Sequence, residues 1–485
     1  MTKKNGLTGV TLVLLALLVF ISVYAVIHHI KCVNFPYPLE YREGVVQYWV
    51  NCFVDEKPLY PKTGEEPPYV HNPYGPLYLI IAGIFQKLLP QKHTFFASRL
   101  LSFFSLLIAC FFIFKIIKSR GACLMAGLLG AGFFLCSPIS INYGSIEIVD
   151  ILALSSGFAG LYAATKNTKT GYLFSGIFCA AAFLTKLVFI LPCISIFIAI
   201  MLAKEKERGY FFAGLAIFLF LAFSILFLKY GANIITHFIT LSSLPLSISH
   251  FFNVFSSTGP RHAFLFSFLA IFAGTMKDKR DPLYWYCLLV PVTFLFSAKV
   301  GSEANYFLEI IALSSVATGI LFEKIGVSAK SIFLVACIAQ MFLFLPFKSA
   351  PVFTKTYGQE LPFATGSYPS HALKEAGEII EGELMSVSDP VFSEDTGWLV
   401  VAGKEVIIEP YQFSQLARYG RWDEVHIVNM IKEKQFNLIL MSVDSYEKGS
   451  EKFTPSMLEA IKTNYQIKRV IGNFYILEPR LWPEV

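Results

Sequence analysis

Charged residues are scarce in this chain of 485 residues. They make up 15% of the chain, whereas apolar residues make up 55%. Soluble domains carry roughly 25% charged residues. The part before about residue 350 is therefore too apolar for a water-soluble domain. The polar remainder has the composition of an ordinary soluble domain.

Several short motifs are also missing. No Cys-x-x-Cys pair occurs among the nine cysteines, and the polar C-terminal part holds neither Gly-x-Gly-x-x-Gly nor Gly-x-x-x-x-Gly-Lys. A nucleotide site in that part is therefore unsupported. Basic residues are spread along the chain rather than gathered in one patch, which argues against a nucleic-acid partner. Cys32 and Cys52 share one loop, where an oxidising compartment would allow a disulfide.

Basic residues gather at six points between apolar stretches. The six clusters are Lys3/Lys4, Lys115/Lys118/Arg120, Lys166/Lys169, Lys204/Lys206/Arg208, Lys277/Lys279/Arg280 and Lys324/Lys330. Basic residues beside spanning helices stay on the cytoplasmic side. Placing all six clusters there leaves only Lys186, Lys229, Arg261 and Lys299 in the short outer loops. This predicts a cytoplasmic N-terminus and a C-terminal part outside.

Eleven apolar segments are predicted to cross the membrane. They are 7–28, 98–116, 121–138, 149–165, 171–185, 188–203, 209–228, 263–276, 282–298, 304–322 and 331–348. The apolar segment 76–89 is left out because it is short for a span of about 20 residues. Counting it would also move every later basic cluster to the other side. The first segment lacks a small-residue cleavage site and is interpreted as a retained helix rather than a signal peptide.

The predicted fold is an all-α polytopic membrane domain followed by a small α/β extracytoplasmic domain. The membrane domain covers 1–349 with about eleven transmembrane helices, and its long first outer loop, 29–97, bears interfacial helices such as 44–53. The outer domain covers 350–485. Within it we expect helices over 372–383 and 422–434, and strands over 399–402, 405–409, 437–442 and 474–478.

Two outer loops carry acidic pairs spaced three residues apart. These are Glu40 with Glu43, and Glu147 with Asp150. A carboxylate in low-dielectric surroundings has a raised pKa, which suits a general base. The alternatives are solvated acids for the first pair and, for Asp150, an N-cap or first-turn acid favoured by the helix dipole.

Lys186 is a lone cation within Phe-Leu-Thr-Lys-Leu-Val-Phe-Ile. An ionisable side chain at membrane depth predicts a functional site, and snorkelling is the alternative. Facing an outer cavity, Lys186 would bind phosphate as a point charge. Arg99, at the outer start of the second span, would assist or simply anchor the helix end.

Acids and a cation at the outer face are the groups needed to transfer a sugar from a lipid-anchored phosphate. The carboxylate takes a proton from the acceptor hydroxyl, and the cation stabilises the departing phosphate. Glu43 and Asp150 could also hold a divalent cation, Mg²⁺ or Mn²⁺, through oxygen ligands. No metal-ligand spacing in the sequence is specific for one.

The order of five short motifs resembles a known family. The motifs are LEYREG (39–44), NPYGPLY (72–78), GSIEIVD (144–150), FLTK (183–186) and GSEANYFLE (301–309). Together they resemble the GT-C-fold integral-membrane glycosyltransferases of family 39, the dolichyl-phosphate-mannose-protein mannosyltransferase type, and their aminoarabinose-transferase relatives. The family's first-loop motif usually contains an Asp, which this chain lacks. Glu43 before Gly44 matches the Glu of that motif, and Glu40 is the nearer candidate to replace the missing acid; which of the two is the base stays open.

The resemblance implies sugar transfer from a polyprenyl-phosphate-linked donor to a lipid, glycan or protein acceptor. The reaction would take place at the outer face of a bacterial inner membrane, among membrane lipids and without nucleic acid. The expected catalytic residues are Glu40, Glu43 and Asp150; the expected donor-phosphate ligands are Lys186 and Arg99; and the expected substrate contacts are Tyr41, His71, Tyr74, Glu147, Asn305 and Tyr306. The alternatives are a transporter or flippase of lipid-linked sugars, whose usual paired halves are not found, and a scaffold for the outer domain.

Overall fold

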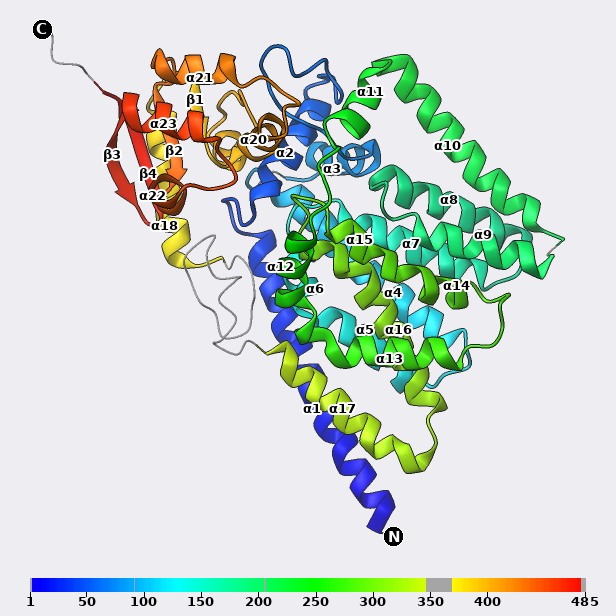
Figure 1. Cartoon of the computed structure of the whole chain (residues 1–485). Coiled ribbons are helices and arrows are strands. Elements are labelled where there is room, and N and C mark those ends of the chain that lie inside the picture. The colour runs from blue at the N-terminus through cyan, green and yellow to red at the C-terminus, as the bar shows by residue number, and fades with distance from the viewer. Residues whose placement is uncertain (1, 91, 205, 346–368, 481–485) are drawn as a thin grey trace, which may run out of the picture.

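The computed structural model describes residues 2–90, 92–204, 206–345 and 369–480. The domain boundary predicted near residue 350 lies outside these residues. The structure is mostly helical, with one small sheet near the C-terminus (Figure 1). The beginning of α1 (Thr2–Val33) lies at the opposite end of the molecule from that sheet.

The helices before residue 346 form one bundle. After α1 they are α2 (Tyr41–Val54), α3 (Pro76–Leu88), α4 (Phe96–Lys118), α5 (Leu124–Cys136), α6 (Pro138–Tyr143), α7 (Asp150–Ala164), α8 (Lys169–Thr185), α9 (Leu191–Ala203), α10 (Arg208–Tyr230), α11 (Asn233–Ile235), the π-helix η1 (Thr236–Thr240), α12 (Ile248–Thr258), the 3-10 helix η2 (Pro260–His262), α13 (Ala263–Thr275), α14 (Pro282–Leu289), η3 (Val290–Val292), α15 (Thr293–Ser297), η4 (Ala304–Phe307), α16 (Leu308–Lys324) and α17 (Val327–Phe344).

A helix occupies each of the eleven segments predicted to cross the membrane, but the count of spans is not confirmed. Among the described residues, four helical segments are long and apolar enough to cross: Gly9–Val33, Phe96–Ser119, Arg208–Tyr230 and Ala304–Lys324. Six further apolar helices have only 10–17 residues, short for a typical bilayer. Segments 44–53 and 76–89 are helical as expected, in α2 and α3.

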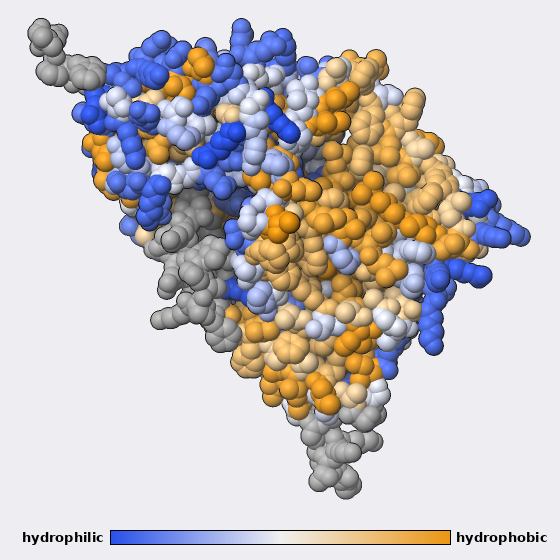
Figure 2. Space-filling view, viewed as in Figure 1, coloured by the Kyte–Doolittle hydropathy of each residue, from blue (hydrophilic) through white to orange (hydrophobic). Residues whose placement is uncertain are grey.

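A broad apolar surface covers the face of the helical bundle that is seen in Figure 2. On α10, for example, Phe220 is 72% exposed and Leu228 is 86% exposed. Soluble monomers rarely expose apolar patches of this extent, and such surfaces face membranes or partners. The outer surface of the C-terminal unit is mainly hydrophilic in the same view. This apolar surface and the long apolar helices indicate a membrane location.

The C-terminal unit is a four-stranded sheet with helices packed around it. Its elements are α18 (His371–Met385), β1 (Val391–Ser393), α19 (Thr396–Val401), α20 (Pro410–Arg418), α21 (Val425–Lys432), β2 (Leu438–Ser442), α22 (Val443–Lys448), α23 (Pro455–Asn464), β3 (Tyr465–Ile471) and β4 (Phe474–Pro479). The strand order is β1-β2-β4-β3. β1 and β2 are parallel, and the other two pairs are antiparallel. A mixed α/β unit is therefore confirmed.

Two of the four predicted strands are wrong. Segment 399–402 belongs mainly to helix α19 because Asp395 caps that helix, accepting a hydrogen bond from the Gly397 N–H at 2.8 Å. This N-cap overrides the β-propensity of Leu-Val-Val. Segment 405–409 joins no sheet; Ile408 forms an isolated bridge with Tyr69 in the first loop. The strands over 437–442 and 474–478 correspond to β2 and β4.

The C-terminal unit packs directly on α2. A Cβ atom on Gly44 would lie 2.0 Å from the Gly397 nitrogen, so the two backbones touch where α2 meets α19. Beside them the rings of Tyr37 and Trp398 stack at 5.6 Å. The Tyr37 hydroxyl also donates to Glu381 at 2.9 Å. The last residue of LEYREG therefore serves close packing between the two parts of the chain.

Candidate active site

Asp150 and Lys186 form a buried ion pair. Lys186 Nζ lies 2.7 Å from Asp150 Oδ1, and the two side chains are 11% and 3% exposed. Asp150 is in the first turn of α7, and Lys186 directly follows the last turn of α8. These helices pack against each other along the chain. The antiparallel pair therefore brings a helix N-terminus, which favours an acid, to a helix C-terminus, which favours a cation.

Asn305 and Tyr306 complete this group from η4. Asn305 Nδ2 donates to Asp150 Oδ1 at 2.8 Å. Lys186 Nζ lies 4.5 Å from the centre of the Tyr306 ring, a cation–π contact. Four residues predicted for the site are thus in contact, although they come from three separate segments. We call Asp150, Lys186, Asn305 and Tyr306 the lysine centre.

Tyr74 reaches the same region through Gly75. A Cβ on Gly75 would lie 1.8 Å from the Leu184 carbonyl oxygen, and the Gly75 N–H donates to the Thr185 carbonyl at 3.2 Å. Only glycine allows this approach of the loop before α3 to the end of α8. The pKa of the Tyr74 phenol is raised, first by burial and also by the negative charge of Asp150. The NPYGPLY motif therefore lies beside the lysine centre.

Glu40 and Arg42 form a second group with Glu303. Arg42 donates to Glu40 Oε1 at 3.0 Å and to Glu303 Oε2 at 3.1 Å. The Tyr143 hydroxyl also donates to Glu303, at 3.2 Å. Glu303 lies two residues before Asn305, so one short segment connects this group to the lysine centre. We call Glu40, Arg42 and Glu303 the glutamate centre.

The spacing of Glu40 and Glu43 has a local structural cause. The Glu40 side chain accepts from the Arg42 N–H at 2.8 Å, and the Glu43 side chain accepts from the Glu40 N–H at 3.3 Å. This is a capping box at the start of α2. Burial raises the pKa of Glu40 to about 7 despite the opposing charge of Arg42. The Glu40 side chain remains 17% exposed.

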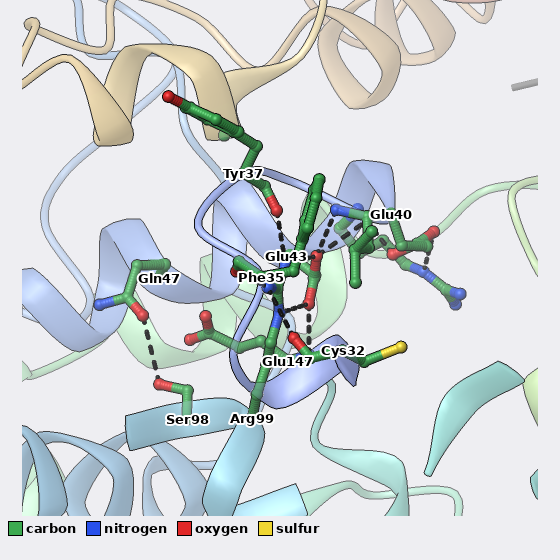
Figure 3. A network of polar contacts seen from close by, with 12 residues as sticks. Cys32, Phe35, Tyr37, Glu40, Glu43, Gln47, Ser98, Arg99 and Glu147 are labelled. Atoms are coloured by element: carbon green, nitrogen blue, oxygen red, sulfur yellow. Dashed lines mark hydrogen bonds and ion pairs between the residues drawn. The ribbon is translucent and has the colours of Figure 1, made fainter. Parts of the chain in front are cut away.

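Glu43 belongs to a closed network with Arg99 (Figure 3). Arg99 Nε and Nη2 donate to its two carboxylate oxygens, each at 2.7 Å, and both side chains are fully buried. Arg99 also donates to the backbone carbonyls of Cys32, Phe35 and Tyr37. These five bonds engage Nε, Nη1 and Nη2 of the guanidinium. The structure thus places Arg99 where it fixes the beginning of the first outer loop.

Glu147 also contacts the network of Glu43 and Arg99. Its N–H donates to Glu43 Oε1 at 2.8 Å, and its carboxylate is fully buried. Burial, followed by the charge of Glu43, raises the pKa of Glu147 well above its ordinary value. A terminal atom of the Gln47 amide lies 2.8 Å from Glu147 Oε2 and donates to it when it is nitrogen. Glu147 therefore contacts the Glu43 network rather than the lysine centre.

His71 and Tyr41 contact other parts of the chain. His71 Nε2 lies 2.9 Å from the His237 carbonyl, and the His71 N–H donates to Glu409 at 3.4 Å. The Tyr41 hydroxyl accepts from the Tyr411 N–H at 3.0 Å. Both residues thus lie where the first loop meets the C-terminal unit.

The carboxylates predicted to hold a metal do not gather around one point. Glu43 binds Arg99, and Asp150 binds Lys186 and Asn305. Over the described part of the chain, no three His, Cys, Asp or Glu side chains are grouped so that they could hold a metal ion. The residues at these positions therefore do not fit a divalent cation. Cys32 and Cys52 are both free thiols.

Arg42 and Glu303 were not among the residues predicted for the site. Their positions in the sequence could have identified them, because Arg42 lies inside LEYREG and Glu303 lies inside GSEANYFLE. A charge pairing between these two motifs was not visible from spacing, because 261 residues separate them.

Solved structures of other proteins have a similar architecture. No protein-family model matches the sequence, and no curated protein matches it. Among solved structures, ArnT from Cupriavidus metallidurans in the apo state superposes with a TM-score of 0.61 at 11% identity, over 95% of this chain and 97% of that one. The same protein bound to undecaprenyl phosphate gives a TM-score of 0.60.

A second similarity is to the oligosaccharyltransferase AglB from Archaeoglobus fulgidus, in complex with an inhibitory peptide and a dolichol-phosphate. Its TM-score is 0.54 at 11% identity, over 94% of this chain and 74% of that one. Both proteins are GT-C-fold glycosyltransferases. The chain has the GT-C fold. The resemblance in the five sequence motifs is confirmed at the level of fold, and sequence identity this low carries no residue roles with it.

Proposed function

We propose that this protein is a membrane glycosyltransferase that moves a sugar from a polyprenyl-phosphate-linked donor to an acceptor hydroxyl. The observation that carries the proposal is the lysine centre, in which a buried Lys186 is held by Asp150, whose carboxylate also accepts a hydrogen bond from Asn305. A fold similar to that of proteins solved with undecaprenyl phosphate and dolichol-phosphate supports it. We place the reaction at the outer face of a bacterial inner membrane, with the C-terminal unit (350–485) on the same side.

We assign the general base to Glu40. Glu43 is sealed by Arg99, whereas Glu40 is partly exposed and has a pKa of about 7. A base with a pKa near the working pH transfers protons most effectively. Glu40 removes the proton of the acceptor hydroxyl, whose oxygen forms a new bond to the anomeric carbon of the sugar. The bond from that carbon to the phosphate oxygen breaks, and its electron pair stays on the phosphate.

We assign stabilisation of the departing phosphate to Lys186. A preorganised cation aimed at a developing negative charge lowers the barrier most when its position is fixed before reaction. Asp150 and the Tyr306 ring fix Lys186 in this way, and Asn305 holds the Asp150 carboxylate. We assign Glu43, Arg99 and Glu147 to holding the first loop, and Tyr41, His71 and Tyr74 to the surroundings in which acceptor and sugar lie.

Paired variants of the two glutamates test the assignment. Glu40→Gln should abolish transfer of a labelled sugar from a polyprenyl-phosphate donor to whole cell envelopes, which supply the acceptor. Glu43→Gln should lower the melting temperature. Glu65→Gln is the matched control, because Glu65 lies in the same loop in an exposed pair with Lys62. Full activity of Glu40→Gln and of the Glu40→Gln/Glu43→Gln double variant would refute the mechanism.

A further inference from the structure

Lys299 is a half-buried lysine in the turn between α15 and η4. No carboxylate of the residues described in the structure pairs with its ammonium group. The same turn leads within a few residues to Glu303 of the glutamate centre and to Asn305 and Tyr306 of the lysine centre. An unpaired cation held at low exposure is costly and marks a functional position.

The backbone around Lys299 is fixed. The Val300 N–H donates to the Pro245 carbonyl at 3.0 Å, and the Ser247 N–H donates to the Ala298 carbonyl at 2.8 Å. Leu246 and Lys299 form an antiparallel bridge between these two bonds. The Lys299 side chain therefore extends from a backbone position that hydrogen bonds hold in place on the outer side of the bundle.

The charge balance beside Lys299 favours an anionic ligand. Burial and the positive charge of Lys186 both lower the pKa of Lys299. Lys299 in turn contributes to the lowered pKa of His71, which is due mainly to burial. Asp150 already neutralises the charge of Lys186. The positive charge of Lys299 is therefore not balanced by a carboxylate of the described residues. A phosphate between the two lysines would balance it.

A strip of exposed apolar side chains begins at Leu246, whose backbone forms the β-bridge with Lys299. Leu246 is 70% exposed, and Ile248 and Phe252, one turn apart on α12, are 76% and 59% exposed. The other face of α12 packs inward, with the rings of Phe255 and Phe294 5.8 Å apart. An excess cation next to an apolar strip matches an amphiphile that has an anionic head and a hydrocarbon tail.

We propose that Lys299 binds the phosphate of the lipid-linked donor, whose polyprenyl chain leaves over Leu246, Ile248 and Phe252. This inference rests on the proposed function and adds a second cation and a lipid path to it. Lys186 and Lys299 then contact the same phosphate from two sides. Because Lys299 has no acid beside it, its affinity for phosphate is not offset by an internal partner.

Binding to the full-length protein in nanodiscs tests the headgroup contact without knowledge of the sugar. The probes are undecaprenyl phosphate and undecaprenol, which share a chain and differ in the phosphate. Lys299→Gln should weaken undecaprenyl phosphate binding about tenfold, as expected for loss of one charged contact, and leave undecaprenol binding unchanged. Lys299→Arg should restore binding because it keeps the charge. The matched control is Lys62→Gln, at an exposed lysine paired with Glu65.

A Leu246→Asn/Phe252→Asn double variant tests the path of the chain. It should weaken both long-chain lipids and raise KM for a long-chain donor, while leaving a short-chain donor unaffected. Equal effects on both chain lengths would overturn the path. Equal binding of undecaprenyl phosphate by wild type and Lys299→Gln would overturn the headgroup contact, as would competition by inorganic phosphate at the same concentration as the lipid. Failure of the wild type to bind undecaprenyl phosphate would instead overturn the proposed function.

Discussion

Lys186 Nζ donates to Asp150 Oδ1 at 2.7 Å and so joins the end of α8 to the beginning of α7. Both side chains are almost completely buried, at 11% and 3% exposure. The pair is placed by chain topology, since two consecutive antiparallel helices bring their outer ends together. It supplies a fixed cation that is paired with Asp150.

Breaking this pair one residue at a time should cost more than removing it. Asp150→Asn leaves a buried lysine without its acid, and loss of one partner of a buried pair costs roughly 3–5 kcal/mol. Asp150→Asn/Lys186→Met should therefore melt at a higher temperature than Asp150→Asn in detergent micelles, while both stay inactive. If the two variants melt at the same temperature, the ammonium is hydrated and not held by Asp150.

Arg99 should prove a positioning residue for the first loop. Arg99→Lys keeps the charge but cannot make the five hydrogen bonds to Glu43 and to three carbonyls. We expect a large fall in melting temperature, with KM for the lipid donor unchanged in the folded fraction. A raised KM at unchanged stability would return Arg99 to the phosphate site, as the sequence alone predicted.

Transfer activity should depend on pH through Glu40. Its pKa is about 7, and a base acts only when deprotonated, so kcat/KM should fall about tenfold for each pH unit below 7. Glu40→Asp should keep part of this dependence. Glu65→Gln, the exposed control, should leave the profile unchanged. A wild-type profile flat between pH 5 and pH 8 would contradict the assignment.

Glu409 should make the folded protein less stable as pH rises. Burial raises the pKa of this carboxyl to about 8 from an ordinary value of 4.5. The folded state therefore holds the proton more tightly than the unfolded state. This stabilisation is complete below pH 4.5 and is lost up to pH 8, by an amount on the order of 5 kcal/mol.

Glu409→Gln cannot ionise, so its melting temperature should exceed that of the wild type at pH 8 and match it at pH 5. Glu405→Gln, four residues earlier and exposed, is the control and should melt as the wild type does at both values. A wild-type melting temperature that rises between pH 5 and pH 8 while Glu409→Gln stays constant would show the opposite sign.

The sequence predicts the lysine centre better than the glutamate centre. Asp150 and Lys186 are recognisable because each is a charge at the end of an apolar helix, and consecutive antiparallel helices meet at their ends. The partner of Glu43 could not be predicted, because Arg99 lies 56 residues away and reaches it through the packing of α4 against the first loop. Glu40 and Glu43 share a spacing that a capping box explains without any chemistry.

In the C-terminal unit, too, only part of the structure could be predicted from the sequence. Strands β2 and β4 follow from apolar sequence alone, whereas 399–402 became helical through a cap at Asp395. Segment 405–409 found its partner at Tyr69, more than 300 residues earlier in the chain. Local propensity does not reveal partners of this kind, and contacts between the first loop and the C-terminal unit could only be seen in three dimensions.

The most direct test of the account is donor cleavage by wild type and Lys186→Met. Both proteins are incubated with a polyprenyl-phosphate-linked sugar and whole cell envelopes, and the released polyprenyl phosphate is measured by mass spectrometry. We predict release by the wild type, release at the same rate by the Glu65→Gln control, and a loss of at least about a hundredfold in Lys186→Met. Release by Lys186→Met at the wild-type rate would contradict the assignment of the lysine centre to the departing phosphate.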